Sequence, residues 1–199
     1  MHNFRANYDK ILEVLKSLDL ESENFLFQIR KPRLSDLKLV PLNMTSEYMS
    51  IDSEYQLFRI LPSDIKSLIE RSVYNRRKRR IFIHMERIRK LLAEKFNGSE
   101  KYFIVDSMPL EVCKLSRSSR SKICRETDYA IPNKGYCASQ KMHYYGYKLH
   151  AVCSAEGVFQ SLDISPASVH DIHYLKDIKQ QFKNCTLLAD KGYLSAEYQ

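Results

Sequence analysis

The chain has 199 residues, of which 44% are hydrophobic, and it carries a formal net charge of +8. This composition is typical of a folded domain and excludes a disordered chain. No apolar run approaches the roughly 20 residues of a membrane span, and the N-terminus lacks the apolar stretch of a signal peptide. Five scattered cysteines without a CxxC pair indicate reduced thiols of a cytosolic protein. A zinc site of Cys113, Cys124, Cys137 and His143 is the alternative, although their spacing matches no zinc motif.

The positive charge is concentrated in two blocks. Residues 71–101 hold eleven Lys or Arg against three acids, and residues 114–148 hold eight against two, so the rest of the chain is mildly acidic. Such clustering predicts a polyanion partner, and we expect nucleic acid. The alternative is a solvated helical face followed by a mobile basic loop.

Residues 1–100 read as a helical, basic region that we expect to bind DNA. Ser35 is placed to cap a short helix, and Thr45 or Ser46 to cap a second one. The turn between them, at 41–43, is compatible with a helix-turn-helix DNA binder. A small helical bundle without base recognition is the alternative.

Pro62 suits the first position of a longer helix whose apolar face continues to Val73. A run of five basic residues follows, Arg76, Arg77, Lys78, Arg79 and Arg80. Consecutive like charges repel, and DNA phosphates would neutralise them; a solvated helix surface is the alternative. The sequence Asn97-Gly98-Ser99 then predicts a boundary near residue 100.

Two apolar runs each end in an aspartate. Residues 102–105 lead into Asp106, and 185–189 lead into Asp190. A continuous apolar run predicts a strand buried on both faces. Because a buried carboxylate is costly, each aspartate should lie at the end of its strand, facing solvent, metal or substrate. We expect Pro109 to end the pairing of the first strand.

Between these runs, residues 114–144 form a long basic segment without a clear period. Its tyrosines alternate with cations that we assign to DNA binding, Lys134, Lys141 and Lys148. The rings would stack on nucleic acid or pack on a sheet edge. A hairpin is predicted over 147–164 with its turn at 155–157, and then a helix. The pair His170-Asp171 is more typical of a helix cap than of a metal site.

The predicted order is therefore β-β-β-α-β, with aspartates ending the first and fourth strands. This is the beginning of a ribonuclease H-like α/β fold. If those strands are parallel neighbours, ~4.8 Å apart, Asp106 and Asp190 reach one divalent cation. Hard oxygen ligands select Mg²⁺ or Mn²⁺.

Four stretches resemble the DDE transposases of bacterial insertion sequences, most closely the insertion-sequence 982 family. They are FIVDSMPLEVC at 103–113, GYCASQKMHYYGYKLHAVCSAEGV at 135–158, ISPASVHDIHYL at 164–175 and LLADKGY at 187–193. The resemblance implies a ribonuclease H-like core over 101–199 that cuts and joins DNA with two metal ions. Asp106 would be the first catalytic carboxylate and Asp190 the second. Lys191, Gly192 and Tyr193 would contact the DNA backbone.

The resemblance also implies a third carboxylate on a helix beyond Gln199, since Glu197 is too close to Asp190. We therefore expect a truncated transposase that does not complete strand transfer and has one apolar sheet face uncovered. The alternative is a non-catalytic DNA-binding remnant or an inhibitor of the intact enzyme. A repair or RNA-cutting nuclease is disfavoured by the DKGY stretch. The implied partners are double-stranded DNA, as terminal inverted repeats and target, and a second subunit when intact, in the cytoplasm at the nucleoid.

Overall fold

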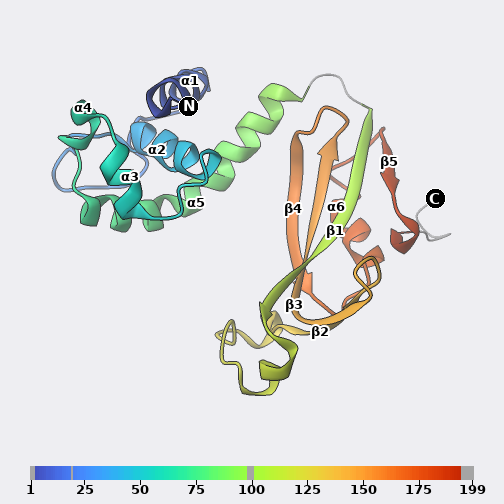
Figure 1. The fold of residues 1–199 in the computed structure, drawn as a ribbon. Helices are drawn as coiled ribbons and strands as arrows, with labels where there is room; N and C mark the ends of the chain where they lie inside the picture. Colours follow the sequence, from blue (N-terminus) through green and yellow to red (C-terminus); the bar gives the residue numbers. More distant parts are fainter. Residues whose placement is uncertain (1–2, 19, 98–100, 194–199) are drawn as a thin grey trace. The chain divides into compact units, whose positions relative to one another are not determined.

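The structure is a computed structural model that describes residues 3–18, 20–97 and 101–193. It divides into two compact units, residues 1–92 and 93–199. The first contains helices, and the second contains a sheet with one α-helix (Figure 1). No helix of the described residues is long and apolar enough to cross a bilayer.

The helical unit is built from α1 (Phe4–Lys16), α2 (Asp36–Tyr48), α3 (Glu54–Ile60), α4 (Ser63–Lys66) and most of α5 (Arg71–Phe96). Its core includes the apolar face of α1, with Tyr8 and Leu15 almost fully buried. Periodicity of 3.6 residues places these side chains on one face. α1 is therefore an amphipathic helix.

The expected pair of short helices over 35–51 is wrong, because α2 is one helix that runs through Pro41. Ser35 does cap it, with Oγ accepting from the Lys38 N–H at 3.3 Å. Thr45 and Ser46 are buried in its last turn and begin no second helix. An internal proline costs about 3 kcal/mol, and here the burial of the surrounding leucines offsets that cost.

The helix expected from Pro62 to Val73 is also interrupted. The four-residue α4 ends at Lys66, and α5 begins only at Arg71. The Ser67 hydroxyl donates to the Asp64 carbonyl at 2.8 Å. Such a local side-chain bond competes with continuation of the helix.

The sheet unit contains β1 (Tyr102–Cys113), β2 (Asn133–Cys137), β3 (Met142–Ser154), β4 (Phe159–Pro166), α6 (Ile172–Ile178) and β5 (Thr186–Ala189). Short 3₁₀ turns lie at Leu115–Arg120 (η1), Asp128–Ala130 (η2) and Lys191–Tyr193 (η3). β3 pairs antiparallel with β1 along one edge and with β2 and β4 along the other. β5 pairs with β1 in parallel.

This arrangement contains the predicted strand order, with β2 as an addition from the long basic segment. The predicted hairpin turn is confirmed, since Gly157 there has φ +89° and its N–H donates to the Ser154 carbonyl at 3.0 Å. The first and last strands, β1 and β5, are parallel neighbours, which was the condition for placing Asp106 and Asp190 at one cation.

Pro109 does not end β1, which continues to Cys113 with Pro109 opposite Lys148 on β3. The pairing of β1 with β5 stops at Val105. Beyond that point, no other described strand borders this edge of β1. A proline is tolerated where its missing N–H would face away from a partner strand.

The first strand is buried on one face, and the expectation of two buried faces is wrong for the described residues. Phe103 and Val105 pack with Tyr174 and Ile178 of α6. Ile104 is 49% exposed and Leu188 of β5 is 53% exposed. These two residues are paired in the register and so share the opposite face. The uncovered apolar face expected from the resemblance is therefore present among the described residues.

Candidate active site

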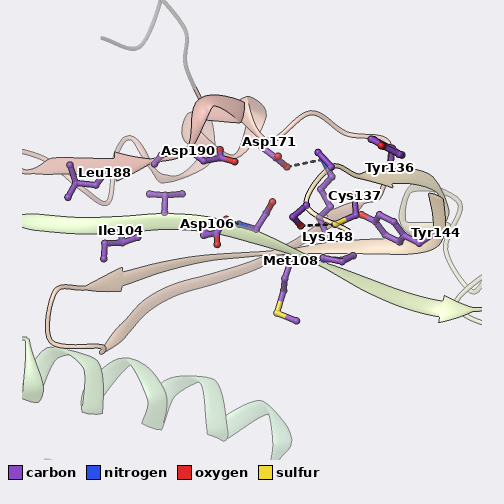
Figure 2. Close-up of a pocket in the computed structure, with 16 residues that line it drawn as sticks. Ile104, Asp106, Met108, Tyr136, Cys137, Tyr144, Lys148, Asp171, Leu188 and Asp190 are labelled. Carbon is purple, nitrogen blue, oxygen red and sulfur yellow. Dashed lines mark hydrogen bonds and ion pairs between the residues drawn. The ribbon is translucent and has the colours of Figure 1, made fainter. Parts of the chain in front are cut away.

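β1 and β5 bring two aspartates into one pocket. Asp190 follows the end of β5 as predicted, whereas Asp106 lies within β1, paired with Ala151 of β3, so the expectation that it ends its strand is wrong. The last pair in the parallel register is Val105 with Ala189, and the next residues are Asp106 and Asp190. Both line a pocket of about 700 Å³ (Figure 2). Asp106 Oδ1 accepts from the Ser107 N–H at 2.7 Å, and Asp190 Oδ1 accepts from the Gly192 N–H at 2.9 Å. Two exposed carboxylates next to the point where the β1–β5 pairing stops can face a common cation.

A third acid, Asp171, lines the same pocket and was assigned differently from the sequence. It occupies the position before α6, but its side chain makes no capping hydrogen bond. Its Oδ1 instead pairs with Lys148 Nζ at 2.9 Å (Figure 2). Lys148 also donates to the Val169 carbonyl at 2.9 Å. The cap interpretation is therefore wrong for Asp171, whereas the Ile172 N–H at the start of α6 does donate to His170 Nδ1 at 3.4 Å. The His170-Asp171 dipeptide was the only sign of this acid in the sequence. Its partner Lys148 lies on β3, far from Asp171 in the chain.

Gly192 allows the acids to approach each other. A Cβ at this position would lie 3.1 Å from Asp190 Oδ1 and 3.3 Å from Asp171 Oδ2. The two carboxylates therefore flank the same glycine, and any side chain there would displace one of them. Lys148 supplies the positive charge that balances this acidic wall.

Tyr193 and His150 lie behind the pocket in the core. Tyr193 is 4% exposed, and its hydroxyl lies 3.3 Å from His150 Nδ1, so the ring points inward. This placement contradicts the expected contact of Tyr193 with the DNA backbone. Burial lowers the pKa of His150 and raises the pKa of Tyr193, so both are neutral near pH 7. Alternation along β3 places His150 on the same face as Lys148 and Val152, so the sequence alone does not predict that His150 is buried.

The carboxylate oxygens of the pocket are the ligand type that a hard divalent cation prefers. Mg²⁺ is commonly held by one or two protein carboxylates, with water and substrate phosphate completing its shell. Asp106 and Asp190 supply that number. In the described part of the chain, no three His, Cys, Asp or Glu residues are grouped to hold a metal ion. The zinc alternative has no support there, and none of the five cysteines, all within the described ranges, forms a disulfide. Glu197 lies outside the described residues.

Comparison with known proteins decides the family. Residues 97–199 match the transposase DDE domain. The chain belongs to this family. A curated relative, the transposase for insertion sequence element IS1106 of Neisseria meningitidis serogroup B, is 40% identical to this chain over 57 residues. That match covers 28% of this chain and spans only 20% of the relative. No solved structure matches.

The first basic block of this DDE-family chain is divided by the geometry of α5. Arg76, Arg79 and Arg80 are exposed, and Lys78 is half-buried with Nζ 3.5 Å from Glu47. Arg77 is buried, and its guanidinium binds Asp36 and the Leu34 carbonyl. Its assignment to DNA is therefore corrected. Successive helical residues point about 100° apart, so a run of five cannot face one phosphate backbone.

The other predicted DNA-contacting cations also differ in placement. Lys134, Lys141 and Lys191 are exposed, whereas Lys148 lies in the pocket wall. Among the aromatic residues, Tyr144 and Tyr145 are buried in the sheet, but Tyr129 is 87% exposed. Packing in the sheet is therefore confirmed for Tyr144 and Tyr145, and stacking on nucleic acid stays a prediction for exposed rings such as Tyr129.

Proposed function

We propose that this chain carries the metal- and DNA-binding part of an insertion-sequence transposase, which cuts and joins DNA strands with divalent metal. The observation that carries the proposal is the convergence of Asp106 and Asp190 in one pocket of a DDE-family chain. The sheet order β4-β3-β1-β5, with β1 and β5 parallel, supports a ribonuclease H-like core. The closer relation to the insertion-sequence 982 family rests on the four sequence stretches alone.

Asp106 and Asp190 would hold Mg²⁺ or Mn²⁺ through their carboxylate oxygens. When bound, the metal activates an attacking oxygen and stabilises the leaving oxygen of a phosphodiester. Lys148 would bind the phosphate. An ammonium has three N–H donors, and two of those of Lys148 are directed to Asp171 and Val169. The third would donate to a phosphate oxygen in the pocket.

Metal binding tests the proposal without requiring turnover. We expect Asp106→Asn and Asp190→Asn each to weaken Mn²⁺ affinity about tenfold or more, or ~1.4 kcal/mol, measured by the resonance signal of free Mn²⁺. Asp163→Asn is the matched control, because Asp163 is an exposed strand aspartate whose Oδ1 also accepts from the next N–H at 2.7 Å. Equal affinity in all three variants would contradict the proposal.

Strand cleavage tests the finer question of activity. Nicking of plasmid DNA with Mg²⁺, lost in Asp106→Asn, would show that residues 1–199 suffice for cutting. Metal and DNA binding without nicking would favour the DNA-binding or inhibitory role.

The exposed arginines of α5 support DNA binding through phosphates. Replacing Arg76, Arg79 and Arg80 by glutamine should flatten the salt dependence of DNA affinity, by a slope of ~0.9 for each phosphate that is no longer neutralised. The control removes the same charge from exposed Lys10, Lys16 and Arg59, which lie outside the two basic blocks. Fluorescence anisotropy of a labelled duplex at several salt concentrations provides the slopes. Identical slopes for the two triple variants would refute a specific role of α5.

A further inference from the structure

The strand that carries Asp190 is held by few backbone contacts. β5 pairs with β1 over four residues only, Thr186–Ala189. Asp190 follows the last paired residue, so the ladder does not fix its carboxylate. The 3₁₀ turn η3 provides local bonds, from the Tyr193 N–H to the Asp190 carbonyl at 3.2 Å and from the Gly192 N–H to Oδ1 at 2.9 Å. The position of Asp190 therefore depends on what anchors this turn.

The anchor is the buried side chain of Tyr193. Its hydroxyl lies 3.3 Å from His150 Nδ1 on β3, and the side chain of Ser107 is close enough to influence its pKa. Ser107 follows Asp106 on β1 and is paired with His150 in the β1–β3 register. One hydroxyl thus connects the turn after Asp190 with the strand residue next to Asp106.

His150 is itself held firmly. It is 2% exposed, its Nε2 lies 2.8 Å from Ser165 Oγ on β4, and its ring stacks on Tyr174 of α6 at 4.8 Å. A neutral imidazole has one donor and one acceptor nitrogen, which match the two hydroxyls of Ser165 and Tyr193. The charged groups that influence the ring are Asp171, Lys148, Asp163 and Asp177.

We propose that His150 and Tyr193 form a positioning pair that fixes the Asp190 carboxylate relative to Asp106 and so sets the divalent-metal affinity of the pocket. The inference rests on the proposed function. Neither residue lines the pocket, so both act through the turn. Residues that orient a metal ligand typically contribute 10–100-fold to metal affinity.

The test compares two tyrosines of the same core. Tyr193→Phe removes the hydroxyl that reaches His150, whereas Tyr174→Phe removes one that donates to Ser161 Oγ at 3.1 Å. Both rings are buried and stay in place. We expect Tyr193→Phe to weaken Mn²⁺ affinity about tenfold, and Tyr174→Phe to leave it unchanged. Urea unfolding of the metal-free chain should give similar losses for both. His150→Gln should reproduce the Tyr193→Phe effect if it folds.

The outcomes separate the two proposals. Wild-type protein that fails to bind Mn²⁺, or binds it independently of Asp106, overturns the proposed function and this inference with it. Wild-type binding that depends on Asp106 and Asp190 but is unchanged in Tyr193→Phe overturns the positioning pair alone. Equal weakening in Tyr193→Phe and Tyr174→Phe also overturns it, because general loosening of the core would then explain the effect.

Discussion

Replacing Arg77 by methionine should destabilise the helical unit by about 3–5 kcal/mol, the usual cost of leaving a buried charge without its partner. The side chains of Arg77 and Asp36 are 7% and 0% exposed, and Arg77 Nη2 lies 2.5 Å from Asp36 Oδ1. Methionine retains much of the arginine volume but removes the positive charge. The carboxylate of Asp36 would remain buried and uncompensated.

This ion pair organises the segment that precedes α2. Asp36 Oδ2 accepts from the N–H groups of Phe25 and Leu26 at 2.9 and 3.0 Å, and Arg77 Nη1 donates to the Leu34 carbonyl at 2.8 Å. Loss of Arg77 therefore affects the segment before α2, the start of α2 and the packing of α5 together.

Urea unfolding followed by the helical circular dichroism signal measures the effect. Arg76→Met is the matched control, since Arg76 is the exposed neighbour and should change stability by about 0.5 kcal/mol or less. The double variant Arg77→Met with Asp36→Leu should be less destabilised than Arg77→Met alone, because no charge is then left unpaired. Equal midpoints for Arg76→Met and Arg77→Met would show that the pair contributes nothing.

Arg77 also shows where reasoning from the sequence ends. Five basic residues in a row are indistinguishable by composition, and only the tertiary position of α5 decides which one faces the core. Pro41 gives the same lesson, because the turn suggested by local propensity was overridden by burial of the helix around it. Local sequence patterns predicted the strands and the hairpin of the sheet unit better than the helix bounds of the helical unit. In the sheet unit, the alternation of residues along the strands and the turn residues agree with the fold.

The candidate site was predictable in part. Asp106 and Asp190 follow apolar runs, so chain order and strand pairing were enough to place them together. The ion pair of Lys148 with Asp171 joins residues 23 positions apart in the chain, and its formation depends on how β3 faces the start of α6. The DNA contact of Tyr193 is implied by the resemblance alone, and the sequence does not reveal that its hydroxyl reaches the buried His150.

Replacing Gly146 by alanine should destabilise the sheet unit by about 3 kcal/mol, at the upper end of ordinary overpacking costs. A Cβ there would clash with the Leu110 carbonyl oxygen and lie 3.0 Å from the Val112 nitrogen. Both are backbone atoms of β1, which cannot rotate away as a flexible side chain does. Gly146 lies opposite the irregularity in β1 between Glu111 and Cys113, so strand β1 would have to move.

The movement should reach the pocket, because both strands involved also line it. Pro109 and Lys148, which are paired two residues from Gly146 and its partner Glu111, are both pocket residues. Hydrogen exchange of peptides from β1 and β3 should therefore increase in Gly146→Ala. Gly157→Ala is the control: its Cβ meets nothing within 4 Å, and only its φ of +89° is unfavourable, at a cost of about 1–2 kcal/mol. If Gly157→Ala lowered the stability of the sheet unit as much as Gly146→Ala, steric crowding between Gly146 and the β1 backbone would not be the dominant constraint on the β1–β3 pair.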